Sequence, residues 1–244
     1  MTSSEILLEM LTETAKNLNR HRDLDELLHA VVDLCLEAVG ADSCFVYLLE
    51  QNELVLRASS NAHPEEVGRL KMRIGEGITG WVAQQRRPVA LSQHAADDGR
   101  FKFYSNLPED RFEAFLSVPI LFRNQVLGVV NLQHRSGHEH APEEIKAMQA
   151  LGQMVGAAIE AESMRGRAEQ NEAALVERKL VERAKGLLQK QQNLSEEDAY
   201  RLLQQESRRS RRSMAVVAQT LLAGRDLKTD GLHESAAGHG NGTH

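Results

Sequence analysis

The sequence predicts an α+β domain with an antiparallel sheet and flanking helices, joined by a long helix to a small all-α bundle of three helices. Residues 43–58 and 114–133 each contain two strand-like runs separated by a two-residue turn. Apolar residues recur at helical spacing before residue 40 and again after residue 142. Charge divides the chain in the same way: residues 1–165 carry 16 Lys and Arg against 24 Asp and Glu, whereas residues 166–223 carry 11 against 8.

Two helices are expected first. The earlier one spans about 4–18, and the next begins after Asp23, which forms a capping box with Glu26. Gly40 is expected to close that second helix, whose apolar face includes Cys35. With only two cysteines, Cys35 and Cys44, the chain has no disulfide framework, and both thiols are expected in the core.

From residue 43 the spacing of apolar residues changes from that of a helix to the period of two that is typical of β-strands. Strands are expected at 43–50 and 53–58 around a Gln51-Asn52 turn, and a third at 68–74. A short helix (ITGWVAQQ, 78–85) ends before Pro88 and is followed by a polar loop to about residue 113. Strands at 114–122 and 125–133 flank an Arg123-Asn124 turn. Hairpin-linked strands between helices predict an antiparallel sheet with helices on one side.

A long helix begins at Pro142. Its apolar seam is interrupted over 160–172, which includes Gly166, and resumes at Ala173. The segment is therefore expected to be a continuous or briefly bent helix. Two arrangements are open for residues 142–190. Either this helix pairs with the same helix of a second chain in a short coiled coil, or it packs only on its own domain.

Two shorter helices complete the predicted bundle. Ser195 with Asp198 predicts a helix start, and a last helix contains Met214, Val217, Ala218 and Leu221. Residues 224–244 lack apolar content and are expected to be disordered. The expected division is thus 1–165, 166–223 and a tail at 224–244. No apolar run approaches a membrane span and no secretory signal opens the chain, which favours a reducing cytoplasm.

Two blocks resemble known families. GEGITGWVAQQRRPV (75–89) and FLSVPILFRNQVLGVVNLQ (115–133) are similar to GAF domains. The loop region 94–120 is similar to a GAF subgroup found in a nitrogen-branch phosphotransferase enzyme and in activators of nitrogen fixation. Residues 176–222 resemble the ANTAR domain through Ala184-Lys185-Gly186, Leu188, Leu194-Ser195, Ala199-Tyr200 and Val217-Ala218. The resemblance implies a small-molecule sensor controlling a three-helix RNA-binding module that recognises paired stem-loops of a leader transcript.

Basic residues suited to RNA gather in the second block. Arg201, Arg208 and Arg212 are 7 and 4 residues apart, so one helix would align them on a stripe. The full candidate set is Arg183, Lys185, Lys190, Arg201, Ser207, Arg208, Arg209, Arg211 and Arg212. Arginine suits phosphates and base edges because its planar fork donates two parallel hydrogen bonds. Ser207 either donates to the nucleic acid or is a small residue at a helix contact, and Tyr200 is expected in the core.

The predicted sensor pocket rests on one loop. Arg100, Lys102, Tyr104 and Arg111 alternate with Phe101, Phe103 and Phe112, a mixture that suits a small anionic metabolite. An equally weighted alternative is that the aromatic residues anchor a lid over the sheet and that the cations are exposed to solvent. Trp81 is expected to pack under the short helix rather than to contact a ligand.

The sequence does not support a more specific ligand or a catalytic activity. The Asn-Lys-Phe-Asp-Glu signature of cyclic-nucleotide-binding GAF domains is missing from the sequence, and methionine-sulfoxide-reducing GAF enzymes need three cysteines. His134, His138 and His140 match no strong zinc spacing and are expected in a surface loop, and no catalytic triad or phosphate loop is found. No cofactor, metal or enzymatic activity is predicted.

The main prediction is therefore a ligand-controlled RNA-binding antiterminator that acts as a homodimer, with RNA polymerase affected only indirectly. Two alternatives stay open: a DNA-binding regulator using the same arginines, and a GAF redox or ligand sensor with a helical dimerisation module.

Overall fold

The computed structural model describes residues 3–20, 23–60, 66–102 and 112–224. The chain separates into two compact units, Met1–Met164 and Arg165–His244. Each unit has apolar cores of its own. The tail predicted to be disordered lies, apart from Gly224, outside the described residues.

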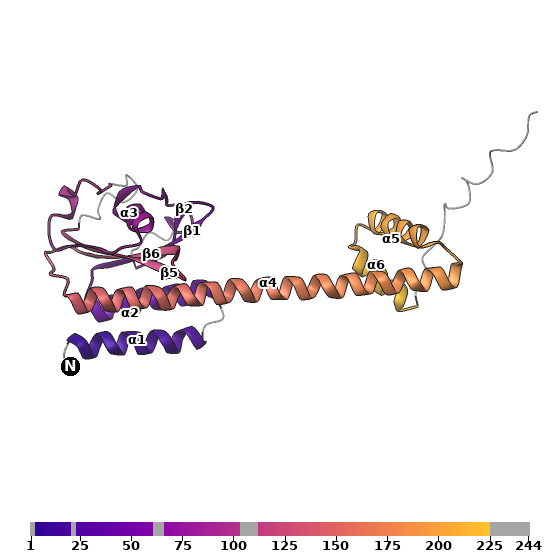
Figure 1. Cartoon of the computed structure of the whole chain (residues 1–244), viewed down its shortest axis with the longest axis horizontal. Coiled ribbons are helices and arrows are strands. Elements are labelled where there is room, and N and C mark those ends of the chain that lie inside the picture. The colour runs from indigo at the N-terminus through magenta and orange to yellow at the C-terminus, as the bar shows by residue number, and fades with distance from the viewer. Residues whose placement is uncertain (1–2, 21–22, 61–65, 103–111, 225–244) are drawn as a thin grey trace, which may run out of the picture. The chain divides into compact units, whose positions relative to one another are not determined.

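The first unit is built on a six-stranded antiparallel sheet with the strand order β3-β2-β1-β6-β5-β4 (Figure 1). The strands are β1 (Ser43–Glu50), β2 (Glu53–Ser59), β3 (Lys71–Arg73), β4 (Val89–Leu91), β5 (Ala114–Phe122) and β6 (Gln125–His134). The predicted antiparallel sheet and its two hairpins are confirmed. β4, however, lies where only a polar loop was expected. It pairs with β5 over three residues, too few to show a period-two pattern in the sequence.

Both hairpins turn through residues in the left-handed region. Gln51 and Asn52 have φ of 51° and 95°, and Arg123 and Asn124 have φ of 45° and 66°. Two-residue hairpin loops need positive φ at both central positions because only that twist matches the flanking strands. Asn accepts this conformation more readily than most residues, which explains its place at the second position of each turn.

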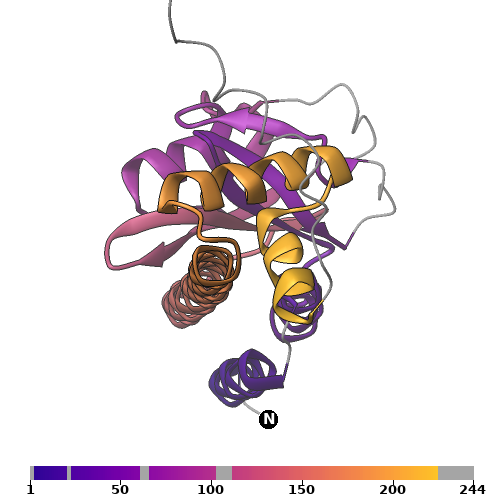
Figure 2. The same ribbon diagram turned by 90° about the vertical axis from the view of Figure 1, so that its right-hand side faces the viewer.

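The sheet is covered on both faces rather than on one. Helix α2 (Leu24–Val39) and the first part of α4 pack on one face, and α1 (Ser3–Arg20) packs against α2 on the side away from the sheet, as Figures 1 and 2 show. Helix α3 (Gly77–Gln85) packs on the other face. Adjacent strand residues accordingly divide between two cores: Val46 faces the long helices, and Phe45 faces α3. The sequence did not predict α3 as a second layer on the sheet. This helix has only nine residues, and its buried positions are nearly continuous instead of forming one stripe.

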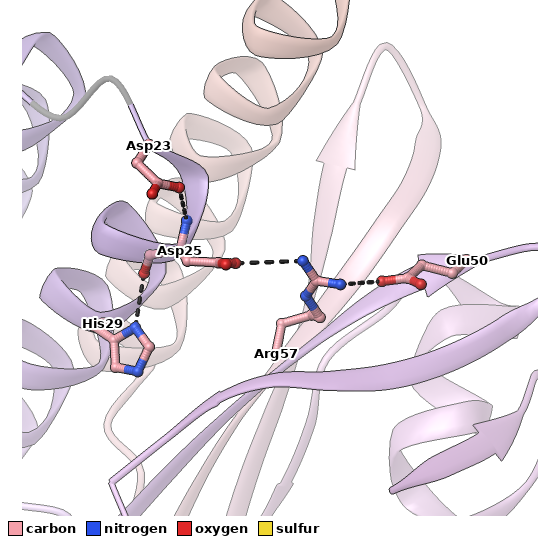
Figure 3. Close-up of polar contacts among 5 residues, drawn as sticks. All are labelled: Asp23, Asp25, His29, Glu50 and Arg57. Carbon is pink, nitrogen blue, oxygen red and sulfur yellow. Dashed lines mark hydrogen bonds and ion pairs between the residues drawn. The ribbon is translucent and has the colours of Figure 1, made fainter. Parts of the chain in front are cut away.

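Helix α2 is tied to the sheet at its N-terminus (Figure 3). The Asp23 carboxylate accepts a hydrogen bond from the Asp25 N–H at 3.0 Å, which confirms the predicted N-cap, and Gly40 closes the helix at φ 67°. The Arg57 guanidinium, from β2, bridges Asp25 (3.3 Å) and Glu50 of β1 (2.9 Å). This bridge connects the start of α2 with the first hairpin.

The second unit is the predicted three-helix bundle. It comprises the C-terminal part of α4 (Pro142–Gln192), α5 (Glu196–Ser210) and α6 (Met214–Leu222). Helix α4 begins at Pro142 as predicted and continues through the polar segment at 160–172 without interruption. Ser195 and Ser213 cap the two following helices by accepting hydrogen bonds from the backbone N–H groups of Asp198 and Val216. The bundle core is formed by Ala184, Leu188, Ala199, Leu202, Leu203, Val217, Ala218 and Leu221.

Candidate functional site

Four arginines are concentrated at the C-terminal end of α5 and in the turn after it. We call Arg208, Arg209, Arg211 and Arg212 the arginine cluster; all four are exposed. Arg209 forms an ion pair with Glu206 at 2.9 Å. Within the described part of the chain, the guanidinium groups of the other three have no acidic or hydrogen-bonding partner. Such uncompensated positive charge attracts the phosphates of a nucleic acid.

The single arginine stripe expected along one helix is not formed. Helix α5 ends at Ser210, and Arg211 adopts a left-handed conformation with φ 54°, so Arg212 lies in the turn and not on the helix. The Ser207 hydroxyl donates to the Arg212 carbonyl at 2.6 Å, and the Arg212 N–H donates to the Ser207 carbonyl at 3.2 Å. Ser207 thus holds the turn that displays the arginine cluster, and its contact with nucleic acid stays a prediction.

The opposite end of α5 is acidic, and it neutralises two of the predicted RNA-binding residues. Arg201 forms an ion pair with Glu197 at 2.6 Å. Lys185 lies 2.7 Å from Glu196 and 3.1 Å from Glu182, and these hydrogen bonds raise the pKa of Lys185. Since only 9% of the Lys185 side chain is exposed, this lysine joins α4 to α5 rather than presenting its charge. By contrast, Arg183 and Lys190 are exposed on α4.

Tyr200 was expected in the core, but 43% of it is exposed. The core is filled by its neighbours Ala199, Leu202 and Leu203. Successive helical residues are about 100° apart, so Tyr200 points away from that face. An exposed aromatic ring beside Arg201 is available for stacking on an unpaired base.

In the first unit, the described cations of the predicted pocket are already paired with acids. Arg100 makes hydrogen bonds of 2.8 and 2.7 Å to Asp98, and its guanidinium lies 4.7 Å from the Trp81 ring centroid. These contacts hold the pKa of Asp98 at about 2. Lys102 forms an ion pair with Glu76. Tyr104 and Arg111 lie outside the described residues.

A buried polar row on the α3 side of the sheet was missed by the sequence analysis. The Ser117 hydroxyl donates to Asn131 Oδ1 at 2.7 Å, and Asn131 Nδ2 donates to the Thr79 hydroxyl on α3 at 2.8 Å. Ser43 and Gln133 are paired in the neighbouring register, and among the described residues neither Ser43 Oγ nor Gln133 Oε1 has a hydrogen-bond partner. Polar residues in otherwise apolar strands were the signal that should have pointed to this row. Buried oxygens without partners are suited to donors of a small ligand.

Both cysteines are fully buried and unpaired by a disulfide, as predicted. A hydrogen bond with Cys35, together with complete burial, raises the pKa of the Cys44 thiol well above its ordinary value. Because the thiolate is the reactive form, this environment works against thiol chemistry.

Of the three histidines near the end of β6, which were expected in a surface loop, two are buried and His138 lies in a partly exposed connection. His134 is 4% exposed and His140 is 7% exposed. Their rings converge with that of His138, and the prediction of a surface position is therefore wrong for His134 and His140. It failed because Glu144, in the first turn of α4, contacts His138 and His140, which the sequence pattern alone does not show.

The family model for the GAF domain matches residues 21–160. The chain belongs to the GAF domain family. A further family model, that of the ANTAR domain, matches residues 169–222, so the chain combines a GAF domain with an ANTAR domain as the sequence analysis predicted. These are sensor and regulatory domains, and their combination is that of a signal-responsive regulator.

Among curated proteins, the "Phosphoenolpyruvate-dependent phosphotransferase system" proteins of Escherichia coli K12 and Salmonella typhimurium LT2 are each 31% identical to this chain over 123 residues. That segment is 49% of this chain but only 16% of either relative. The similarity to these relatives is thus confined to a domain-sized segment.

Solved structures agree on the fold of the GAF domain. The GAF domain of a phosphoenolpyruvate-protein phosphotransferase from Coxiella burnetii matches with a TM-score of 0.64 and 27% identity, over 68% of this chain and 99% of that one. A free methionine-R-sulfoxide reductase from Neisseria meningitidis matches with a TM-score of 0.57 and 16% identity, over 68% and 95%. At this identity the second match shows the fold alone. In the part of the chain that the structure describes, no helix combines the length and apolar character of a membrane span.

Proposed function

We propose that this protein is a ligand-controlled transcription antiterminator, whose GAF domain binds a small molecule and whose ANTAR domain binds paired stem-loops of a nascent leader RNA. It acts in the cytoplasm, without catalysis, and affects RNA polymerase only by preventing a terminator hairpin from forming. The arginine cluster is the observation that carries this proposal. Its exposed guanidinium groups lie at the end of α5 opposite the acidic first turn, and they define a directional surface for phosphates and unpaired bases.

The RNA-binding surface in this proposal is narrower than the set of residues considered from the sequence. It is centred on the arginine cluster, with Tyr200 as a stacking residue and with Arg183 and Lys190 as additional phosphate contacts. Lys185 supports the surface by joining α4 to α5, Ser207 supports it by holding the terminal turn, and Arg201 is paired with Glu197 of the same helix.

The ligand site we propose lies between α3 and the sheet, over the buried polar row. The unpartnered oxygens of Ser43 and Gln133 favour a ligand that carries hydrogen-bond donors. Arg100 and Lys102 would contribute to anion binding only by exchanging their present carboxylate partners for the ligand.

We further propose that two chains associate through α4. Its segment between the two cores exposes Leu175 and Val176, which are 58% and 52% accessible. Large apolar residues exposed on a long helix favour pairing with a second helix. A dimer would bring together two ANTAR domains, one for each stem-loop.

The decisive experiment is a gel-shift titration of the full chain with a two-hairpin leader RNA, a scrambled RNA and duplex DNA of equal length. Arg208→Ala/Arg212→Ala is expected to bind the hairpin RNA at least about 10-fold more weakly, since two charge-assisted contacts are lost. Arg69→Ala/Lys71→Ala removes the same charge from exposed positions of the GAF domain and is expected to bind like wild type.

Other results would point elsewhere. A preference for duplex DNA would favour the DNA-binding alternative. Equal loss in both double variants would show that total charge, and not the arginine cluster, governs binding. The thiol alternative is tested by Cys35→Ser/Cys44→Ser, since activity that depends on those sulfurs would contradict a purely non-catalytic sensor.

A further inference from the structure

Three imidazole rings converge where β6 passes into α4. His134 is the last residue of β6, and His138 and His140 lie in the connection that follows. One ring nitrogen from each histidine falls within a group whose members are all within 4.8 Å of one another. The His134 and His138 rings are stacked with centroids 3.9 Å apart, and the His140 ring is 4.8 Å from that of His138.

Two of these rings carry buried nitrogens with no partner. His134 Nε2 and His140 Nε2 are both inaccessible to solvent and make no hydrogen bond to any of the residues that the structure describes. Burying a polar nitrogen without a partner is unfavourable, because the nitrogen loses its hydrogen bonds to water and gains none in the protein. Two such nitrogens in one small cluster call for a common partner, and a single cation with imidazole affinity satisfies both.

Glu144, in the first turn of α4, orients two of the rings from the outside. Its carboxylate lies 2.6 Å from His140 Nδ1 and 3.1 Å from His138 Nε2. When the carboxylate accepts a hydrogen bond from the N–H group at each of these nitrogens, His140 Nε2 and His138 Nδ1 keep their lone pairs for a metal ion. A carboxylate that hydrogen-bonds the far nitrogen of a ligating histidine is the usual second layer of a protein metal site.

We propose that His134, His138 and His140 bind one divalent transition-metal ion of the zinc type, with Glu144 fixing the orientation of His138 and His140. Three neutral imidazoles suit Zn²⁺, and also Co²⁺, Ni²⁺ and Cu²⁺, whereas Mg²⁺ and Ca²⁺ prefer oxygen ligands. The fourth position is left to solvent, on the side of His138, whose side chain is 30% exposed.

Binding requires a small closure of the cluster. Nitrogens about 2.0–2.1 Å from a tetrahedral ion are about 3.4 Å apart, so the donors must draw together and the stacked His138 ring must tilt. His138 is the residue able to do so: it lies in an irregular segment, anchored through its backbone N–H to the Ser92 carbonyl at 2.9 Å. The ion would then connect the end of β6 to the start of α4, the helix that leads to the ANTAR domain. This inference stands independently of RNA binding.

The test is metal titration of the full, chelator-stripped chain. His233, His239 and His244 in the C-terminal tail are first replaced by Ala, to remove imidazoles unrelated to the cluster. Zn²⁺ affinity is measured against a chromophoric chelator, and Co²⁺ supplies a visible absorption spectrum that reports coordination directly. One tightly bound ion per chain and a tetrahedral-type Co²⁺ spectrum are expected.

Variants then assign the ligands. His138→Ala, at a partly exposed loop position, is expected to retain the fold and to weaken Zn²⁺ binding at least 10-fold, and Glu144→Gln is expected to weaken it about 10- to 100-fold. His29→Ala, which removes an exposed imidazole from α2, is the matched control and should leave the affinity unchanged. Circular dichroism confirms that each variant is folded. No binding of Zn²⁺, Co²⁺, Ni²⁺ or Cu²⁺ by the parent chain, or equal affinity in His138→Ala, would overturn the proposal.

Discussion

At the scale of single residues, ion pairing and not the number of cations decides which positive charges are available. Ion pairs with acids of the same chain hold Arg201, Lys185, Arg100 and Lys102, whereas the described residues offer no such partner to Arg208, Arg211 or Arg212. A sequence shows where cations occur but not which of them are neutralised. The residues available to a polyanion are therefore a subset defined by the fold.

Asp98 gives a pH-dependent prediction at this scale. Hydrogen bonds from Arg100 lower the pKa of Asp98 from its ordinary 3.8 to about 2 in the folded protein. A depressed carboxyl pKa stabilises the fold above pH 4, and this contribution disappears as the pH falls toward 2. Asp98→Asn is expected to lower the free energy of unfolding by about 1 kcal/mol at pH 7, after allowance for the partial exposure of Arg100.

Urea unfolding across pH 2–7 measures this effect. The difference between wild type and Asp98→Asn should shrink as the pH falls from 4 to 2. Asp97→Asn, the same change at an exposed neighbouring position, should show no comparable dependence. A constant difference for Asp98→Asn at every pH would rule out the carboxylate as its source.

At the scale of elements, α4 lies directly on the backbone of β5 at two glycines. A Cβ atom added to Gly152 would lie 2.5 Å from the Pro119 carbonyl oxygen, and one added to Gly156 would lie 2.3 Å from that of Leu121. Gly166, later on the same helix, has no neighbour within 4 Å of such a Cβ. The first two glycines allow close packing, and the third has no such role.

The contrast between two glycines of one helix yields a prediction. Gly156→Ala is expected to destabilise the GAF domain by roughly 1–3 kcal/mol, because the backbone of α4 must move away from β5. Gly166→Ala is expected to stabilise α4 by up to about 1 kcal/mol, since alanine has the higher helix propensity and meets no obstruction. Thermal unfolding by circular dichroism compares the two, and a stabilised Gly156→Ala would contradict the close approach.

At the scale of the whole molecule, the question is whether α4 joins two chains. Leu175→Glu/Val176→Glu is expected to convert a dimer into a monomer, because four glutamates would meet at one helical seam. Light scattering after size exclusion gives the mass directly. Leu8→Glu, at a residue that is 65% exposed on α1, is the control for adding charge to an apolar surface position. If the wild-type chain is already a monomer at micromolar concentration, the proposed pairing through α4 is wrong.

What the sequence determined by itself is the set of elements with strong local signals. Helix caps at Asp23, Ser195 and Gly40, the two hairpin turns and the start of α4 at Pro142 depend on residues close together in the chain, so local rules were sufficient. The two families were identified in the same way, from contiguous motifs.

Only the tertiary structure decided features that depend on distant partners. β4 exists because β5 offers an edge to a three-residue segment, and α3 forms a second layer because the sheet has a second apolar face. Tyr200 is exposed because its neighbours fill the core, and Arg212 leaves the predicted stripe because Arg211 reverses the chain. The histidine cluster likewise takes shape only when α4 brings Glu144 against the connection that follows β6. Burial and ion pairing are properties of positions in space, and residues far apart in sequence contribute to both.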